Sequence, residues 1–389
     1  MLPEDGLIER RILTISASTF IIMLGAGVVV PILPKYAETF GASYTYVGLT
    51  ISAFGLARIL TDIPSGTLSD RVGRRASLLG GTILFVASGL LAAFSTSIEH
   101  LIAARFVQGV GAAIYTTSAL AYIADIIPAT RKGRYLGYYQ SSVFLGSAFG
   151  PSIGGVLTSI GGLRAPFLTL SALSLVSTLA TYKGVTTTSA GKEIFYKRGS
   201  ISSMVTATLR SRSMIISCVA AATTFILTTA IRFTILPIYS EKVLNLNEVE
   251  IGLVLTVIAL ANFLMIRWAG SISDKFGAVL SMIFGFTLSG LTVVLYSYTY
   301  NLPTLLIVAS AFGVATSLVM PAQVSLAVES SDPRHRGLSM GVYRIFSDGG
   351  LIIGPLLSGV LIEFIPLAYA FYFIAGICFS TALFIYLVH

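Results

Sequence analysis

Long apolar segments separated by short polar connections run along the whole chain. A helix that crosses the hydrocarbon core of a bilayer needs about 20 apolar residues. The first apolar segment follows Arg11 and lacks a small-residue cleavage site, so we interpret it as a spanning helix. The pattern predicts an all-α integral membrane protein with twelve transmembrane helices, centred near Ile22, Ala53, Phe85, Ala112, Gly146, Leu175, Ile226, Ala259, Phe286, Val314, Ile352 and Ile377.

One connection is much longer than the others and lies midway along the chain. It covers residues 183–212 and is rich in Ser, Thr and Lys. We therefore expect two six-helix bundles, an N-terminal one over 1–182 and a C-terminal one over 213–389, joined by a cytoplasmic central linker over 183–212.

The two predicted bundles repeat one another in sequence. GTLSDRVG, which begins at Gly66, recurs as GSISDKFG from Gly270, an offset of 204 residues. The pattern GxxxGP at 146–151 recurs at 350–355 with the same offset. Parallel repeats of this kind occur in transporters, with the substrate site between the repeats near mid-membrane. The repeat therefore predicts pseudo-symmetric bundles and a central substrate site.

Composition supports a membrane location and predicts the topology. The chain is 55% hydrophobic and 11% charged, and its mean hydropathy is +0.86. If the N-terminus is inside, 17 of the 25 Lys and Arg residues fall in inner segments and 3 in outer loops. By the positive-inside rule we expect both termini to be cytoplasmic. We expect the protein to lie in the cell (plasma or inner) membrane. The basic residues form no solvated stripe, so we expect no nucleic-acid partner.

Enzyme chemistry finds no support in the sequence. The three histidines, His100, His335 and His389, lie at loops or at the terminus, and no HExxH, GxSxG or phosphate-loop pattern occurs. Cys218 and Cys378 both lie in apolar runs, which gives no thiol cluster for a metal. We expect no enzyme, no metal and no cofactor, with the proton as the coupling ion.

Seven charged residues lie inside predicted spans, where each costs about 2.5–3.5 kcal/mol at mid-bilayer on insertion scales. Arg58 and Asp62 are one turn apart, as are Arg344 and Asp348, and the two pairs lie at matched depths. One hypothesis is a gate that pairs Asp62 with Arg344 and Arg58 with Asp348 and opens when a carboxylate is protonated. The alternative is that each pair is satisfied within its own helix. The remaining three are Arg105, Arg232 and Arg267.

Polar side chains in other spans are candidates for the substrate cavity, although such side chains commonly just pack. Arg105 and Arg232 have no obvious carboxylate at the same depth, so either could contact an anionic substrate or a carbonyl. Arg267, beside Trp268, is expected to extend to the interface. The cavity candidates are Tyr115, Gln140, Arg232, Asn262 and Gln323.

Three motifs resemble those of the major facilitator superfamily, and in particular its 12-helix drug/proton antiporters (multidrug efflux). They are the loop motif of Gly66, Leu68, Asp70, Arg71, Gly73, Arg74 and Arg75, the helix 4 motif of Arg105, Gln108, Gly109 and Gly111, and GSAFGPSIGG from Gly146 in helix 5. The resemblance covers nearly the whole chain.

The resemblance assigns a role to the loop between helices 2 and 3. It implies that Asp70 lies against helix 11 and that Arg74 pairs with Asp125, a latch that holds the inner side closed. The alternative is that the arginines only anchor the topology. The predicted latch residues are Gly66, Asp70, Arg71, Gly73, Arg74 and Asp125.

Small residues and prolines in helices 5 and 11 predict either hinges or ordinary close packing. Glycines let helix backbones approach each other, and proline removes an intrahelical hydrogen bond. The residues concerned are Gly146, Gly150, Pro151, Gly350, Gly354 and Pro355.

The resemblance implies a secondary active transporter that works by alternating access as a monomer in the lipid bilayer. We expect proton-coupled export of a small drug-like or amphipathic compound; uptake of a sugar, organic anion or lipid is the alternative. A sensor that transports nothing would need no paired charges in its spans. Many drug antiporters of this family carry an acidic residue in helix 1, whereas 12–34 offers only Thr and Ser as polar uncharged side chains. Asp62 and Asp348 would therefore have to carry the proton.

Overall fold

The structure is a computed structural model that describes residues 4–127, 132–186, 211–331 and 336–389. The described residues form helices and their connections, without a strand. Each of the twelve predicted span centres lies in a different long helix, so the predicted all-α membrane fold is confirmed. These helices are α1 (Glu4–Val29), α3 (Tyr44–Val72), α4 (Arg74–Ala93), α5 (Ile98–Ile126), α6 (Lys132–Gly161), α7 (Ala165–Gly184), α9 (Arg212–Thr229), α11 (Glu248–Phe276), α12 (Ala278–Tyr296), α13 (Leu302–Glu329), α14 (Arg336–Phe364) and α15 (Leu367–Val388).

Among the described residues, eleven helical segments are long and apolar enough to cross a membrane, and α3 supplies a twelfth if its two arms count as one span. The arms, Tyr44–Asp62 and Pro64–Val72, meet at a bend of 56°. Proline lacks the backbone N–H that would continue the hydrogen-bond ladder, which explains a bend at Pro64. The count agrees with the predicted twelve spans.

The chain packs into two compact units. Unit 1 comprises Met1–Gly41, Ala53–Ile194 and Ile251–Leu253, and unit 2 comprises Ala42–Ser52, Phe195–Glu250 and Val254–His389. The first residues of α3 therefore pack with unit 2, and three residues of α11 pack with unit 1. The predicted central linker, 183–212, lies mostly outside the described residues, and the predicted domain boundaries stay a prediction.

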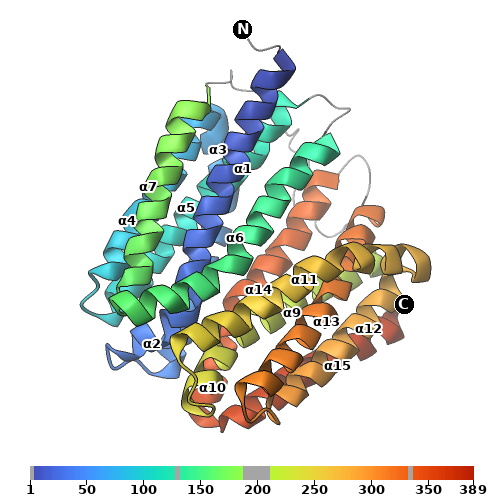
Figure 1. Ribbon diagram of the computed structural model, residues 1–389. Helices are drawn as coiled ribbons and strands as arrows, with labels where there is room; N and C mark the ends of the chain where they lie inside the picture. The colour runs from blue at the N-terminus through green and yellow to red at the C-terminus, as the bar shows by residue number, and fades with distance from the viewer. Residues whose placement is uncertain (1–3, 128–131, 187–210, 332–335) are drawn as a thin grey trace. The chain divides into compact units, whose positions relative to one another are not determined.

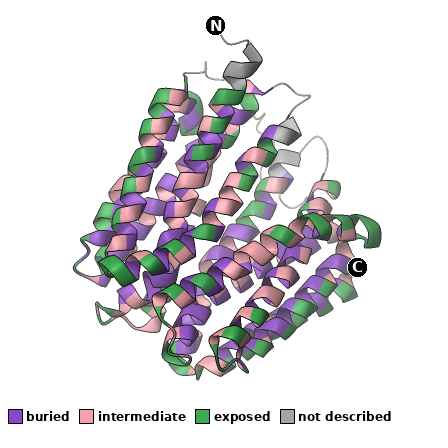
Figure 2. Ribbon diagram, in the orientation of Figure 1, coloured by how far each residue is buried: buried purple, intermediate pink, exposed green. Residues whose placement is uncertain are grey.

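Equivalent helices pack in the same way within each unit (Figure 1). In unit 1, α1 lies against α6 and α7, and α4 lies against α5 and α7. In unit 2, α9 lies against α14, and α12 lies against α13 and α15. Buried faces point toward neighbouring helices and exposed faces point away from them (Figure 2). The sequence repeat is thus a repeat of helix packing.

The first spanning segment of each unit is interrupted before its end. In unit 1, α1 is followed by the 3-10 turn η1 (Val30–Ile32) and the short helix α2 (Leu33–Glu38). In unit 2, α9 is followed by the π helix η3 (Ala230–Ile235) and the short helix α10 (Leu236–Lys242). Each of the two short helices has a proline in its first turn, where a missing N–H costs no helix bond. The two units therefore differ in the type of turn at the interruption.

Candidate functional site

The loop between α3 and α4 holds a charge cluster at the end of unit 1. The Nε of Arg74 donates to Oδ2 of Asp125 on α5 at 3.0 Å. Its Nη1 donates to Oδ1 of Asp70 and to the hydroxyl of Ser69. The Arg74 side chain is 10% exposed and that of Asp70 is 54% exposed. The structure thus places Arg74 against Asp125, whereas the predicted position of Asp70 against helix 11 and the closing role of the latch stay predictions.

Gly73 makes the tight turn of this loop possible. Its φ of +92° is in the left-handed region, where glycine has no Cβ to clash. Gly277, which is 204 residues further on, has a φ of +89° before α12. Of the other predicted latch residues, Gly66 is half-buried and Arg71 is exposed.

A buried arginine lies on α5. Arg105 and Gln108 are 8% and 2% exposed, and Nη1 of Arg105 donates to Oε1 of Gln108. The guanidinium carbon lies 5.0 Å from the ring centroid of Phe54 on α3, which is a cation–π contact. Gly109 lets the two helices approach, because a Cβ there would collide with the carbonyl oxygen of Phe54. The helix 4 motif therefore fixes a cation against an aromatic ring inside unit 1.

The glycines of the two GxxxGP motifs lie in close helix contacts. In unit 1, a Cβ on Gly150 would lie 2.5 Å from the Cα of Gly27 on α1. In unit 2, a Cβ on Gly354 would lie 2.7 Å from the carbonyl oxygen of Ile226 on α9. Gly146 and Gly350 are equally tight against the same two helices. The geometry is that of close packing within each unit, and a hinge at these glycines stays a prediction.

The prolines of the same motifs meet glycines that are themselves repeat equivalents. A Cβ on Gly252 would collide with the carbonyl oxygen of Pro151 in unit 1. A Cβ on Gly48 would collide with the carbonyl oxygen of Pro355 in unit 2. Gly48 and Gly252 are 204 residues apart, and so are Pro151 and Pro355. The repeat therefore extends to these two contacts.

The four predicted gate residues form two ion pairs within their own helices. Nη2 of Arg58 lies 3.8 Å from Oδ2 of Asp62 on α3. Nε of Arg344 lies 3.7 Å from Oδ2 of Asp348 on α14. The side chain of Asp348 is 8% exposed and that of Asp62 is 13% exposed. The observed pairing is therefore the one within each helix, and the alternative pairing of Asp62 with Arg344 and of Arg58 with Asp348 stays a prediction.

Three of the cavity candidates are held in helix packing. Tyr115 is fully buried, and its hydroxyl is 3.0 Å from that of Thr19 on α1. Asn262 donates to the carbonyl oxygen of Gly313 and to Thr316 on α13, at 3.3 and 3.2 Å. Gln323 is fully buried and accepts from the hydroxyl of Thr224 at 3.0 Å. The fourth candidate, Gln140, is exposed on α6.

The remaining two arginines differ in their surroundings. Arg267 is exposed on α11 beside the exposed Trp268, as expected of an interfacial arginine. Arg232 lies in the π helix η3, and its Nε has no exposed surface and no hydrogen-bond partner among the described residues. The sequence analysis missed the π helix and the Phe54 ring beside Arg105. The number of residues that separates equivalent positions in the two halves changes near Arg232, and this change was the signal in the sequence for the π helix.

A duplicated bundle of helices that cross the membrane, with charged side chains inside the spans, defines a membrane transporter. The family model of the Major Facilitator Superfamily matches residues 15–265 and again 223–389, so the chain belongs to this superfamily. No described His, Cys, Asp or Glu residues gather as a metal cluster. The protein is a multi-pass membrane transporter and not an enzyme, and it resembles the drug/proton antiporters of the family.

Relatives and solved structures agree with this assignment. The chain is 29% identical to an uncharacterised MFS-type transporter of Methanocaldococcus jannaschii, over 95% of this chain and 96% of the relative. It is 25% identical to the quinolone resistance protein NorA of Staphylococcus aureus, over 91% and 90% of the two chains. Its fold is similar to that of a bacterial homologue of the human lysosomal transporter Spinster, with a TM-score of 0.78, 17% identity and coverage of 100% and 96%.

Proposed function

We propose that this transporter exports drug-like or amphipathic compounds in exchange for protons. The observation that carries the proposal is the pair of carboxylates inside the spans, Asp62 and Asp348, each one turn from an arginine. An ionisable group inside a membrane is costly unless it is paired, and such groups mark proton relays in transporters. The quinolone resistance relative and the GxxxGP motif of helix 5 support export.

The proposal includes a gate made of Arg58, Asp62, Arg344 and Asp348. In this gate the arginines exchange carboxylate partners between α3 and α14 during the transport cycle, and protonation of a carboxylate releases its arginine.

A charge swap tests the gate. We expect Asp62→Arg alone and Arg344→Asp alone to abolish transport, because each places two like charges in the proposed gate. The double variant, Asp62→Arg with Arg344→Asp, should recover part of the flux measured in reconstituted vesicles. If the double variant is as inactive as either single variant, the exchange of partners is wrong.

Proton coupling is tested on the unaltered chain. The purified protein is reconstituted into vesicles with an imposed pH gradient, and the flux of cationic dyes, organic anions and lysolipids is followed. We expect flux of an amphipathic compound that rises with the gradient and reverses when the gradient is reversed. Flux that ignores the gradient would remove the antiport proposal and leave facilitated transport.

The same experiment addresses the alternative, which is uptake of an organic anion. The buried Arg105 and the half-buried Arg232, neither of which forms an ion pair with a described carboxylate, favour an anionic solute. We further propose that the protein acts as a monomer in the cell membrane, with both termini cytoplasmic and with the proton in place of any cofactor. The excess of basic residues in the predicted inner segments supports this orientation.

A further inference from the structure

The interrupted first helices of the two units differ in length by one residue. Before the interruption, the carbonyl of Leu24 faces Gly150 and that of Ile226 faces Gly354, so equivalent residues are 202 apart. After it, Tyr36 packs on Phe167 and Tyr239 packs on Phe371, and the two tyrosines are 203 apart. Unit 2 therefore holds one extra residue between Ile226 and Tyr239.

The π helix η3 takes up this extra residue. A π helix closes hydrogen bonds from residue i to i+5 and so accommodates a single insertion within a helix, frequently at a functional site. Unit 1 has the 3-10 turn η1 at the same place, without an insertion. Arg232 lies in the middle of η3, and its equivalents in unit 1 are Val29 by one offset and Val30 by the other. The insertion thus coincides with a change from an apolar side chain to a cation.

The surroundings of Arg232 offer donors and aromatic rings. Its guanidinium is close enough to the phenol of Tyr296, at the end of α12, for an electrostatic interaction. Tyr296 is fully buried, and its hydroxyl, like Nε of Arg232, has no hydrogen-bond partner among the described residues. The Tyr296 ring lies 5.6 Å from that of Phe371 and 5.8 Å from that of Phe312. Two polar atoms, Nε of Arg232 and the hydroxyl of Tyr296, therefore lack a hydrogen-bond partner among the described residues in an aromatic part of unit 2.

We propose that Arg232 and Tyr296 form a recognition site for the carboxylate of an amphipathic organic anion. Guanidinium and phenol can both donate to one carboxylate, and hydrogen bonds to an ionised group are stronger than those between neutral groups. The fully buried rings of Phe312 and Phe371 hold the phenol of Tyr296 in place. The site names a substrate class for the proposed transport function and rests on it.

Two dyes that differ only in a carboxylate test the site. Rhodamine B carries a free carboxylate, whereas rhodamine B ethyl ester lacks it. Binding of each dye to the purified full-length protein is measured by fluorescence polarisation, and its transport is measured in vesicles of phosphatidylcholine. This lipid has no net charge, so any effect of Arg232 cannot come from an acidic lipid headgroup.

We expect the unaltered protein to bind rhodamine B more tightly than the ester. Arg232→Met should weaken binding of rhodamine B roughly 10- to 100-fold, as loss of a charged hydrogen bond does, and leave binding of the ester unchanged. Arg232→Lys should retain part of the preference, because the charge remains. Tyr296→Phe should weaken rhodamine B binding by roughly 3- to 10-fold, as loss of one hydrogen bond does.

Arg267→Met is the matched control, since this exposed arginine also lies in a span, and we expect it to change neither dye. Binding of the ester shows that each variant is folded. An Arg232→Met protein that loses both dyes equally, or neither, overturns the inference. An unaltered protein that binds and moves only the ester also overturns the inference but leaves the proposed export standing. If it neither binds nor moves either dye, the inference and the proposed export of amphipathic compounds both fail.

Discussion

In unit 1 a buried arginine lies on α5 against Gln108 and Phe54, whereas in unit 2 a half-buried arginine lies on the π helix η3 beside Tyr296. Neither arginine has an arginine at the equivalent position of the other unit. The equivalent of Arg105 is Ala309, and the equivalents of Arg232 are valines. Nη1 of Arg105 has a hydrogen-bond partner and its guanidinium lies over an aromatic ring, while Nε of both arginines has no partner among the described residues. The difference separates an arginine that packs on a ring of its own unit from one that we propose binds a carboxylate.

The glycines of the GxxxGP motifs differ from these arginines, because they occur at equivalent positions in both units and make equivalent contacts. Gly150 and Gly354 each lie against the backbone of the first helix of their own unit, as do Gly146 and Gly350. Close backbone approach requires a small residue, so neither repeat tolerates a change there. The comparison teaches that helix packing is symmetric in this protein, while the charged side chains are not.

The largest expected effect tests the symmetric part. Gly150→Leu and Gly354→Leu should each destabilise the protein by roughly 3 kcal/mol or more, because the new side chain meets backbone that cannot move aside. The measurement is thermal unfolding of the purified protein in detergent. Gly137→Leu and Gly341→Leu are the controls, since a Cβ at either site has open space. If only one of the Gly150 and Gly354 variants is strongly destabilised, helix packing is not equivalent in the two units.

A smaller effect is expected where the repeat is incomplete. Arg74 pairs with Asp125 in unit 1, but unit 2 has Ala278 and Glu329 at these positions, and Glu329 accepts from Ser325 at 2.7 Å. A double-mutant cycle of Arg74→Ala and Asp125→Ala should give a coupling free energy of about 1 kcal/mol at most, because Arg74 is buried but the Asp125 side chain is 30% exposed.

Glu329→Ala, the matched change in unit 2, should alter the unfolding free energy by less than about 0.5 kcal/mol, because Ala278 stands in place of an arginine and the exposed Glu329 accepts only from Ser325 among the described residues. A coupling free energy near zero between Arg74 and Asp125 would show that the pair only anchors the topology, which is the alternative to a latch.

The twelve spans were predictable from sequence because a run of about 20 apolar residues has few other outcomes. The repeat was predictable from Gly66 and Gly270 and from the two GxxxGP motifs. The pairing of Arg74 with Asp125 came from the family resemblance, since residues 51 positions apart carry no local signal. The bend at Pro64 was not predicted, because proline in a spanning helix is tolerated with or without a sharp bend.

The sequence did not decide which partners the charged residues choose. Arg58 and Asp62 are one turn apart on one helix, so their pairing was foreseeable, but so was exchange with the pair of Arg344 and Asp348. The π helix escaped notice because a one-residue insertion leaves the apolar pattern intact. The packing of Gly354 and of Tyr239 shows where the offset changes across the interruption.

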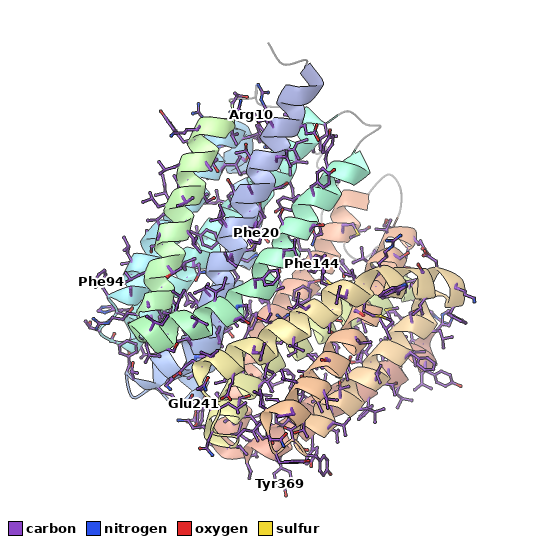
Figure 3. The ribbon with its side chains drawn as sticks, in the orientation of Figure 1. Arg10, Phe20, Phe94, Phe144, Glu241 and Tyr369 are labelled. Atoms are coloured by element: carbon purple, nitrogen blue, oxygen red, sulfur yellow. The ribbon has the colours of Figure 1, made fainter. Side chains whose placement is uncertain are left out.

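The central claim is that the charges that break the repeat do the work of transport. Its most direct test compares Asp62 and Asp348 with their repeat equivalents, Ile266 and Phe144. Phe144, labelled in Figure 3, lies on α6 at the position that Asp348 occupies on α14. Flux driven by an imposed pH gradient is measured for Asp62→Asn, Asp348→Asn, Ile266→Leu and Phe144→Leu in the same vesicles. We predict that the two Asn variants lose the response to the gradient and that the two Leu variants keep it. Asn variants that still follow the gradient as the unaltered protein does would contradict the account.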